Sequence, residues 1–106
     1  MVHQDIEKQL KLVFSPDFLE IVNESSQHNV PPNSETHFRV VLVSAEFENL
    51  ARVARHQSVY GALSEQMAGP VHALALHTYS PNEWRQRQKA APESPECLGG
   101  SKTDVS

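Results

Sequence analysis

The alternating segment 71–79 constrains the fold of this chain more than any other stretch. Gly69-Pro70 precedes it and stops a helix, because proline cannot continue one and glycine tolerates a turn. Ser80-Pro81-Asn82-Glu83 follows it, with a serine that can cap a helix, a proline that can open it and a glutamate that can reach back to the cap. The segment between these two signals is therefore predicted to be a strand.

Side chains of a strand alternate between two faces, so this segment has an apolar face and a face lined mostly by small residues. The first face carries His72, Leu74, Leu76 and Thr78, and the second carries Ala73, Ala75, His77 and Tyr79. We expect the apolar face to meet helices. His72 lies at the rim of that face, where an imidazole can act as a ligand.

Hydrophobic periodicity elsewhere predicts helices over residues 5–14, 49–67 and 81–88, and strands over 18–25 and 36–44. Residues 26–35 carry no packing pattern and form a long loop, of a kind that is often functional. The order α-β-β-α-β-α indicates one α+β domain over residues 1–90, with a mixed three-stranded sheet and helices on one face. Residues 91–106, rich in Pro, Ser and Gly, are predicted to be a flexible tail.

Composition limits the classes of function. The formal net charge of −4 does not draw the protein to DNA or to an anionic membrane, so any nucleic-acid contact needs a local basic patch. No window is apolar enough to span a bilayer and no signal peptide is evident, so we expect a cytoplasmic protein without membrane contact. The single Cys97 fits this compartment, as an exposed thiol or as a metal ligand.

Catalytic motifs are missing. The sequence contains no G-x-S-x-G elbow, no phosphate-binding G-x-x-x-x-G-K-[ST] loop and no H-E-x-x-H pair. We therefore expect that the protein is not an enzyme.

Histidine is abundant, with residues at positions 3, 28, 37, 56, 72 and 77. An ordinary surface or hydrogen-bonded histidine is the default interpretation of any one of them. His28 in the long loop and His72 after the Gly-Pro turn can nevertheless meet at one edge of this fold. Two imidazoles there would make half of a metal site, with a partner supplying the remaining ligands.

Basic side chains suggest a second kind of site. A stripe expected to face the core of the 49–67 helix comprises Leu50, Val53, Val59, Tyr60, Leu63 and Met67. This arrangement leaves Arg52, Arg55 and His56 on the polar side, and Arg39 adds charge from the second strand. These four are candidates for contact with DNA, although a solvated helix face is the simpler explanation on a chain of net charge −4. The element order echoes RNA-binding KH domains, but the G-x-x-G loop of those domains is missing.

The chain resembles the BolA family over residues 6–100. The segments that carry the resemblance are Asn23-Glu24-Ser25 with His28, Val30-Pro31-Pro32, 34–40, Phe47, Arg55-His56 and 69–76, with Pro95-x-Cys97 in the tail. The family's F-x-G turn is here Phe47-Glu48-Asn49. Asparagine is the next best residue for positive φ, so we expect the turn to survive. The resemblance implies a KH-like fold, of the class II KH type without its G-x-x-G loop.

The resemblance also implies two functions. Members of this family pair with monothiol glutaredoxins and share a [2Fe–2S] cluster, held on one side by the glutaredoxin cysteine and glutathione; His72 and His28 correspond to the ligands on the other side. No cofactor is then expected in the isolated protein, which we expect to be a monomer or a weak dimer. The alternative is a DNA-binding transcriptional regulator of stress and cell-shape genes, with the region 52–63 contacting promoter DNA.

Overall fold

The computed structural model describes residues 2–27, 31, 34–88 and 91. His28, Cys97 and most of the predicted tail lie outside the described residues. The elements follow the predicted order, except that the second predicted helix, 49–67, is divided in two. They are α1 (Val2–Phe14), β1 (Phe18–Asn23), a short 3₁₀ turn (Ser25–Gln27), β2 (His37–Val43), a second 3₁₀ turn (Ala45–Phe47), α2 (Arg52–Ala62), α3 (Ser64–Ala68), β3 (Ala73–Tyr79) and α4 (Pro81–Gln86).

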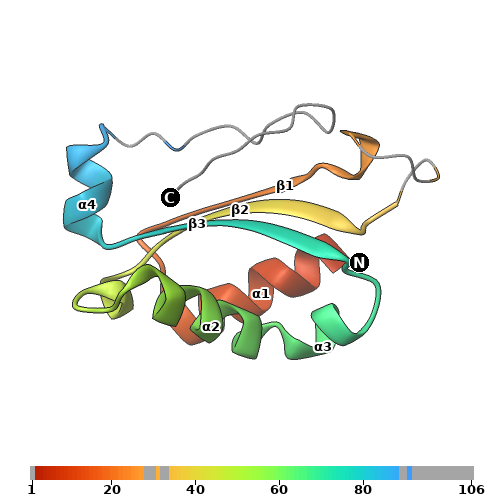
Figure 1. The fold of residues 1–106 in the computed structure, drawn as a ribbon, viewed down its shortest axis with the longest axis horizontal. Coiled ribbons are helices and arrows are strands. Elements are labelled where there is room, and N and C mark those ends of the chain that lie inside the picture. The colour runs from red at the N-terminus through yellow and green to blue at the C-terminus, as the bar shows by residue number, and fades with distance from the viewer. Residues whose placement is uncertain (1, 28–30, 32–33, 89–90, 92–106) are drawn as a thin grey trace.

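The three strands form one mixed sheet in the order β1-β2-β3, which confirms the predicted α+β class. β1 pairs antiparallel with β2, and β2 pairs parallel with β3, with His37 opposite Ala73 and Val43 opposite Tyr79. Because β2 and β3 run in the same direction, both begin at one end of the sheet and both finish at the other (Figure 1). These two ends carry the polar side chains considered below.

Helices α1, α2 and α3 cover one face of the sheet (Figure 1). The predicted apolar face of β3 points toward them and contributes Leu76, and the neighbouring β2 contributes Phe38, Val40 and Leu42. The rest of this core consists of Ile6, Leu10, Phe14, Phe47, Val59, Leu63 and Val71. Periodicity therefore predicts the buried side of the sheet correctly.

The opposite face is covered at one end by α4, so the prediction of helices on one face only is wrong for this last helix. Trp84 of α4 stacks on Phe18 with ring centroids 5.1 Å apart and lies 5.4 Å from the ring of Tyr79. Val41 and Val43 complete this second cluster. The predicted capping box of α4 is present, because the Ser80 side chain accepts from the Glu83 amide and the Glu83 carboxylate accepts from the Ser80 amide.

Helix α1 begins one turn earlier than its periodicity predicts. The amides of Val2 and His3 donate to the two carboxylate oxygens of Glu35, at 3.3 and 3.2 Å. A carboxylate at the start of a helix satisfies free amides and interacts favourably with the helix dipole. Since Glu35 lies far along the chain, local sequence could not reveal this cap.

Strand β1 ends two residues earlier than predicted. The Asn23 side chain accepts a hydrogen bond from the Ser25 amide at 3.0 Å, which turns the backbone out of the sheet. Asparagine side chains offer the backbone this local alternative to a strand ladder. The turn starts the loop that the sequence predicts.

The predicted 49–67 helix is wrong at its start and at its middle. Asn49 adopts φ 67°, which confirms the positive-φ turn but keeps this residue out of the helix. Helix α2 starts only at Arg52, and the fully buried Leu63 leaves helical geometry where its side chain enters the core. The helix is also rotated from the predicted stripe, because Val53 is 66% exposed whereas Arg55 is 8% exposed.

Candidate functional site

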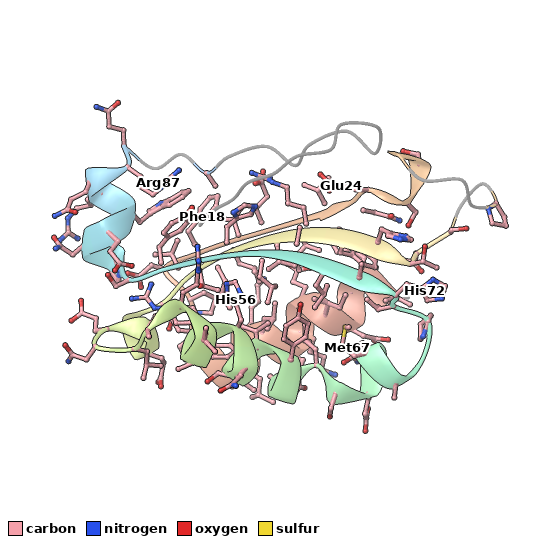
Figure 2. The ribbon with its side chains drawn as sticks, in the orientation of Figure 1. Phe18, Glu24, His56, Met67, His72 and Arg87 are labelled. Carbon is pink, nitrogen blue, oxygen red and sulfur yellow. The ribbon has the colours of Figure 1, made fainter. Side chains whose placement is uncertain are left out.

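Two histidines meet where β2 and β3 begin, and we call this place, with Thr36, His37 and His72, the histidine end. The rings of His37 and His72 lie 6.0 Å apart between centroids and cross edge-on at 79°. His72 is exposed and immediately precedes β3, where its amide donates to the Thr36 carbonyl at 2.8 Å. Figure 2 shows the His72 side chain at the opposite end of the sheet from Arg87.

The ring of His37 is oriented by its neighbour, since Thr36 Oγ1 lies 2.8 Å from His37 Nδ1. The backbone around this pair is also held. Ser25 Oγ, on a residue that is 3% exposed, accepts from the amides of Thr36 and His37 at 2.9 and 3.1 Å. A ring that is oriented by hydrogen bonds presents its remaining nitrogen in a defined direction.

Both flanks of the long loop are tied down at the histidine end. The Asn23 side chain donates to the Ser34 carbonyl at 2.9 Å, which joins the two sides of the loop. Glu35 binds the start of α1, and Ser25 binds the start of β2. His28 is the next residue after this anchored turn, which ends at Gln27. It lies outside the described residues, so its distance to His72 is not defined.

His37 is the residue that sequence reasoning missed. The sequence pairs His72 with His28 and assigns His37 to a strand, whereas the parallel register of β2 and β3 brings His37 beside His72. Recognising that β2 and β3 pair in parallel with these starting residues would have revealed this contact. Within the described part of the chain, no group of three or more potential metal ligands occurs. Two imidazoles alone suit a metal whose other ligands come from elsewhere.

The finishing ends of β2 and β3 carry a different arrangement, which we call the arginine end: Arg52, Arg55, Glu83 and Arg87. Arg55 donates from both terminal nitrogens to the Glu83 carboxylate, at 2.6 and 3.1 Å. It also donates to the carbonyls of Leu50 at 2.9 Å and of Thr78 at 3.1 Å. Arg55 therefore joins the turn before α2, the end of β3 and α4.

This network explains the ionisation of Glu83. Hydrogen bonding from Arg55, reinforced by the Ser80 amide, lowers the pKa of the Glu83 carboxyl below its ordinary value despite partial burial. The expectation that Arg55 lies on a solvated polar face is corrected by its burial. A buried guanidinium needs a partner, and that partner comes from a helix 28 residues along the chain.

The four DNA-contact candidates do not all lie on one surface, although Arg52 and Arg55 line the same pocket. Arg52 is exposed on the first turn of α2, and His56 is half-buried. Burial and the adjacent positive charges of Arg52 and Arg55 lower the pKa of His56. Arg39 lies on the opposite side of the sheet from α2 and binds Glu20 at 3.1 Å.

Comparison with known proteins identifies the family to which this chain belongs. Residues 10–83 match the family model described as BolA-like protein. The chain therefore belongs to the BolA-like family, which confirms the resemblance drawn from its sequence. Among the described residues, no helix has both the length and the apolar character needed to cross a membrane.

Individual relatives cover nearly the whole chain. The chain is 50% identical to the Vibrio cholerae protein named DNA-binding transcriptional regulator BolA, over 96% of each protein. It is 48% identical to human BolA-like protein 1, over 95% of this chain and 73% of the relative. These names describe a regulator and a BolA-like protein rather than enzymes.

Solved structures of the family have the same fold. The solution structure of mouse BolA1 matches with a TM-score of 0.79 and 48% identity, over 92% of this chain and 79% of that one. BolA1 from Arabidopsis thaliana matches with a TM-score of 0.73 and 34% identity, over 78% of this chain and 95% of that one. The likeness to KH domains stays a prediction from element order.

Proposed function

We propose that this protein acts with a monothiol glutaredoxin as an adaptor that shares a [2Fe–2S] cluster in iron homeostasis and the stress response. The observation that carries the proposal is the exposed His72 beside His37 at the histidine end. In this proposal His72 and His28 bind one side of the cluster, and the glutaredoxin cysteine and glutathione bind the other. The compartment is the cytoplasm, which suits a protein with one cysteine.

The donor set fits this cargo. Imidazole nitrogens are established iron ligands in clusters, and replacing thiolates with neutral imidazoles raises the reduction potential. His37, held by Thr36 and lying edge-on to His72, restricts the orientations available to the His72 ring. Imidazole must be deprotonated to bind a metal, so mild acid is expected to release the cluster.

Sharing of a cluster suits the geometry of the histidine end. The described residues bring two imidazoles together there, and in this proposal the partner binds the opposite side of the cluster. Because His72 is exposed, a partner can approach it without any rearrangement of the sheet. A site with one half on each protein also passes its cargo on readily.

The test is a titration of cluster-loaded monothiol glutaredoxin with this protein, followed by ultraviolet–visible absorption and circular dichroism. We expect a spectral change that saturates at an equimolar ratio and is lost in His72→Ala. His56→Gln is the matched control, because Figure 2 shows His56 on α2, away from the histidine end. An unchanged spectrum with the wild-type protein, or an undiminished change with His72→Ala, would contradict the proposal.

A second candidate function is a DNA-binding transcriptional regulator, the activity that the names of the Vibrio cholerae and Escherichia coli relatives describe. In this candidate, Arg52 contacts phosphates, whereas the buried Arg55 supports the helix that carries it. We expect Arg52→Gln to weaken promoter binding and to reduce its salt slope by about one. Fluorescence anisotropy at several salt concentrations measures both quantities, and His72→Ala should leave them unchanged.

A further inference from the structure

The sheet has two edges, formed by β1 and β3 (Figure 1). An edge strand presents backbone amides and carbonyls that no neighbouring strand satisfies, so it can pair with another extended chain. β1 contains Glu20 and is flanked by Asp17 and Glu24, and charges of this kind discourage such pairing. β3 contains no Asp, Glu, Lys, Arg or Pro, so its edge lacks this protection.

The pairing of β3 with β2 determines which backbone groups of β3 remain free. The Ala73 amide donates to the Thr36 carbonyl, and the Tyr79 carbonyl accepts from the Ser44 amide. Because the amide and carbonyl of alternate strand residues point to the same side, the odd-numbered residues of β3 bind β2 and the even-numbered ones face away from it. The residues that face away from β2 are therefore Leu74, Leu76 and Thr78.

Arg55 confirms this orientation and occupies one of the outward groups. Its guanidinium donates to the Thr78 carbonyl at 3.1 Å, which leaves the Thr78 amide free on this side. In the part of the chain that the structure describes, the outward amides and carbonyls of Leu74 and Leu76 have no hydrogen-bond partner. An extended chain along this edge therefore meets donors and acceptors at alternate residues.

Helix α2 contacts β3 and exposes apolar side chains beside this edge. Val53, His56 and Tyr60 fall at i, i+3 and i+7, so they share one side of the helix. Figure 2 shows His56 between α2 and β3, which places this side of the helix toward β3. Val53 is 66% exposed and Tyr60 is 40% exposed, so an apolar surface continues from the edge onto α2.

We propose that the β3 edge binds the β3 edge of a second copy of this chain, as an antiparallel pair whose twofold axis passes between the two Leu76 residues. Each Leu76 then exchanges its free amide and carbonyl with the other as a hydrogen-bonded pair. The Leu74 carbonyl accepts from the Thr78 amide of the second copy, and Ala75 lies opposite its His77. This proposal is independent of the cluster-sharing function.

A second copy suits this edge because the strand is complementary to itself. A twofold interface uses the same surface on both molecules, and this register places a small side chain, Ala75, opposite the larger His77. Each chain carries a formal net charge of −4, but β3 brings no two formal charges face to face. One strand pair with an apolar border is a small interface, so the dimer is expected to be weak.

The first test measures self-association of the full chain by sedimentation velocity from about 10 µM to about 1 mM. We expect a monomer–dimer equilibrium that Ala75→Lys weakens about tenfold or more, because it places a charge in the middle of the paired edge. Val22→Lys is the matched control, since it adds the same charge to β1, where Val22 is 37% exposed.

The second test determines the register by disulfide formation between single-cysteine variants that also carry Cys97→Ser. In the proposed dimer, residues 75 and 77 form a non-hydrogen-bonded pair with Cα atoms about 4.5 Å apart, a separation that a disulfide can span. A mixture of Ala75→Cys and His77→Cys should therefore form heterodimers faster under mild oxidation than a mixture of Ala73→Cys and His77→Cys.

Four outcomes would overturn the proposal. The first is a monomer at every concentration, and the second is equal weakening of the dimer in Val22→Lys. The third is equal rates of disulfide formation in the two mixtures, which would indicate random collision. The fourth is a chain that stays monomeric but whose Leu74 and Leu76 amides shift when monothiol glutaredoxin is added, which would assign the edge to that partner.

Discussion

At the histidine end of the β2–β3 pair, one imidazole is exposed and the other is half-buried, whereas at the arginine end the central guanidinium is buried in a network of hydrogen bonds. His72 is exposed and meets His37 edge-on. Arg55 is 8% exposed and donates to one carboxylate and two carbonyls. The comparison teaches that the basic residues singled out in the sequence differ in their surroundings: Arg55 stabilises the fold, whereas His72 is exposed to a partner.

The largest expected effect comes from removing the centre of the arginine end. Arg55→Ala leaves the Glu83 carboxylate and the Thr78 carbonyl without their donor and should lower the free energy of unfolding by about 3 kcal/mol. This value is at the lower end for a broken buried pair, because the Glu83 side chain is 44% exposed and regains water. Urea unfolding followed by tryptophan fluorescence measures it, since Trp84 lies on the same helix as Glu83.

Arg85→Ala is the control for that variant. Arg85 lies on α4 with Glu83, and its side chain makes an exposed hydrogen bond to Asn82. We expect it to change the free energy of unfolding by less than about 0.5 kcal/mol. Equal losses in the two variants would remove the distinction between a structural and a surface arginine.

The next effect concerns the framework around the histidines rather than the histidines themselves. Glu35→Ala removes the acceptor of the Val2 and His3 amides and should cost about 1 kcal/mol, the usual cost of a lost N-cap. Glu35→Gln keeps one acceptor oxygen and should cost less. Hydrogen exchange of the first turn of α1 should rise in parallel, and unchanged exchange would show that this cap does not hold the helix.

A smaller effect should appear on acidification. Burial is the main cause that lowers the pKa of His56 and of His77 below the ordinary value of 6.5, with nearby arginines adding to it. These two imidazoles therefore bind protons at a higher pH in the unfolded chain than in the folded one. Their contribution to the free energy of unfolding is fully present above pH 6.5, and it declines as the pH falls below 6.5 toward the folded pKa values.

Thermal unfolding across this pH range measures the decline, and the double variant His56→Gln, His77→Gln should flatten it. The lowered pKa of Glu83 acts at a lower pH, since its contribution is lost only as the pH falls below its ordinary value of 4.5. A decline in the double variant that equals the wild-type decline would assign the effect to other groups.

The smallest effect on stability is expected at His72. His72→Ala removes an exposed side chain at the start of a strand, so the free energy of unfolding should change by less than about 0.5 kcal/mol. Urea unfolding of His72→Ala, measured alongside Arg55→Ala, compares the two ends of the sheet directly. A loss of more than about 2 kcal/mol would mean that His72 also serves the fold.

Local signals in the sequence predict much of this architecture. The Gly69-Pro70 turn and the capping box at Ser80 and Glu83 each depend on neighbouring residues and are observed. The positive φ of Asn49 is observed too, but its expectation rests on the F-x-G turn of the family. Features that depend on distant partners could not be predicted in this way. Glu35 extends α1 from a loop, and Glu83 draws Arg55 into the interior against the hydrophobic period of α2.

The candidate site shows the same difference between local and distant determinants. His72 was found from a local turn and an alternating pattern, whereas its neighbour His37 depends on the parallel register of β2 with β3. Periodicity assigns a residue to a face of a strand but does not say which residue of the next strand lies opposite. The register of β3 against β2 is therefore what the sequence alone left open at the histidine end.

The most direct test of the central claim is pulsed electron paramagnetic resonance on the reduced complex of this protein with cluster-loaded monothiol glutaredoxin. Only the histidines of this chain are labelled with ¹⁵N. The account predicts strong hyperfine couplings from two ¹⁵N ligands; the coupling from His72 disappears in His72→Ala, and both persist in His56→Gln. Absence of coupling in the wild-type complex, or couplings that are unchanged in His72→Ala, would contradict the assignment of the histidine end as the side of this protein that binds the cluster.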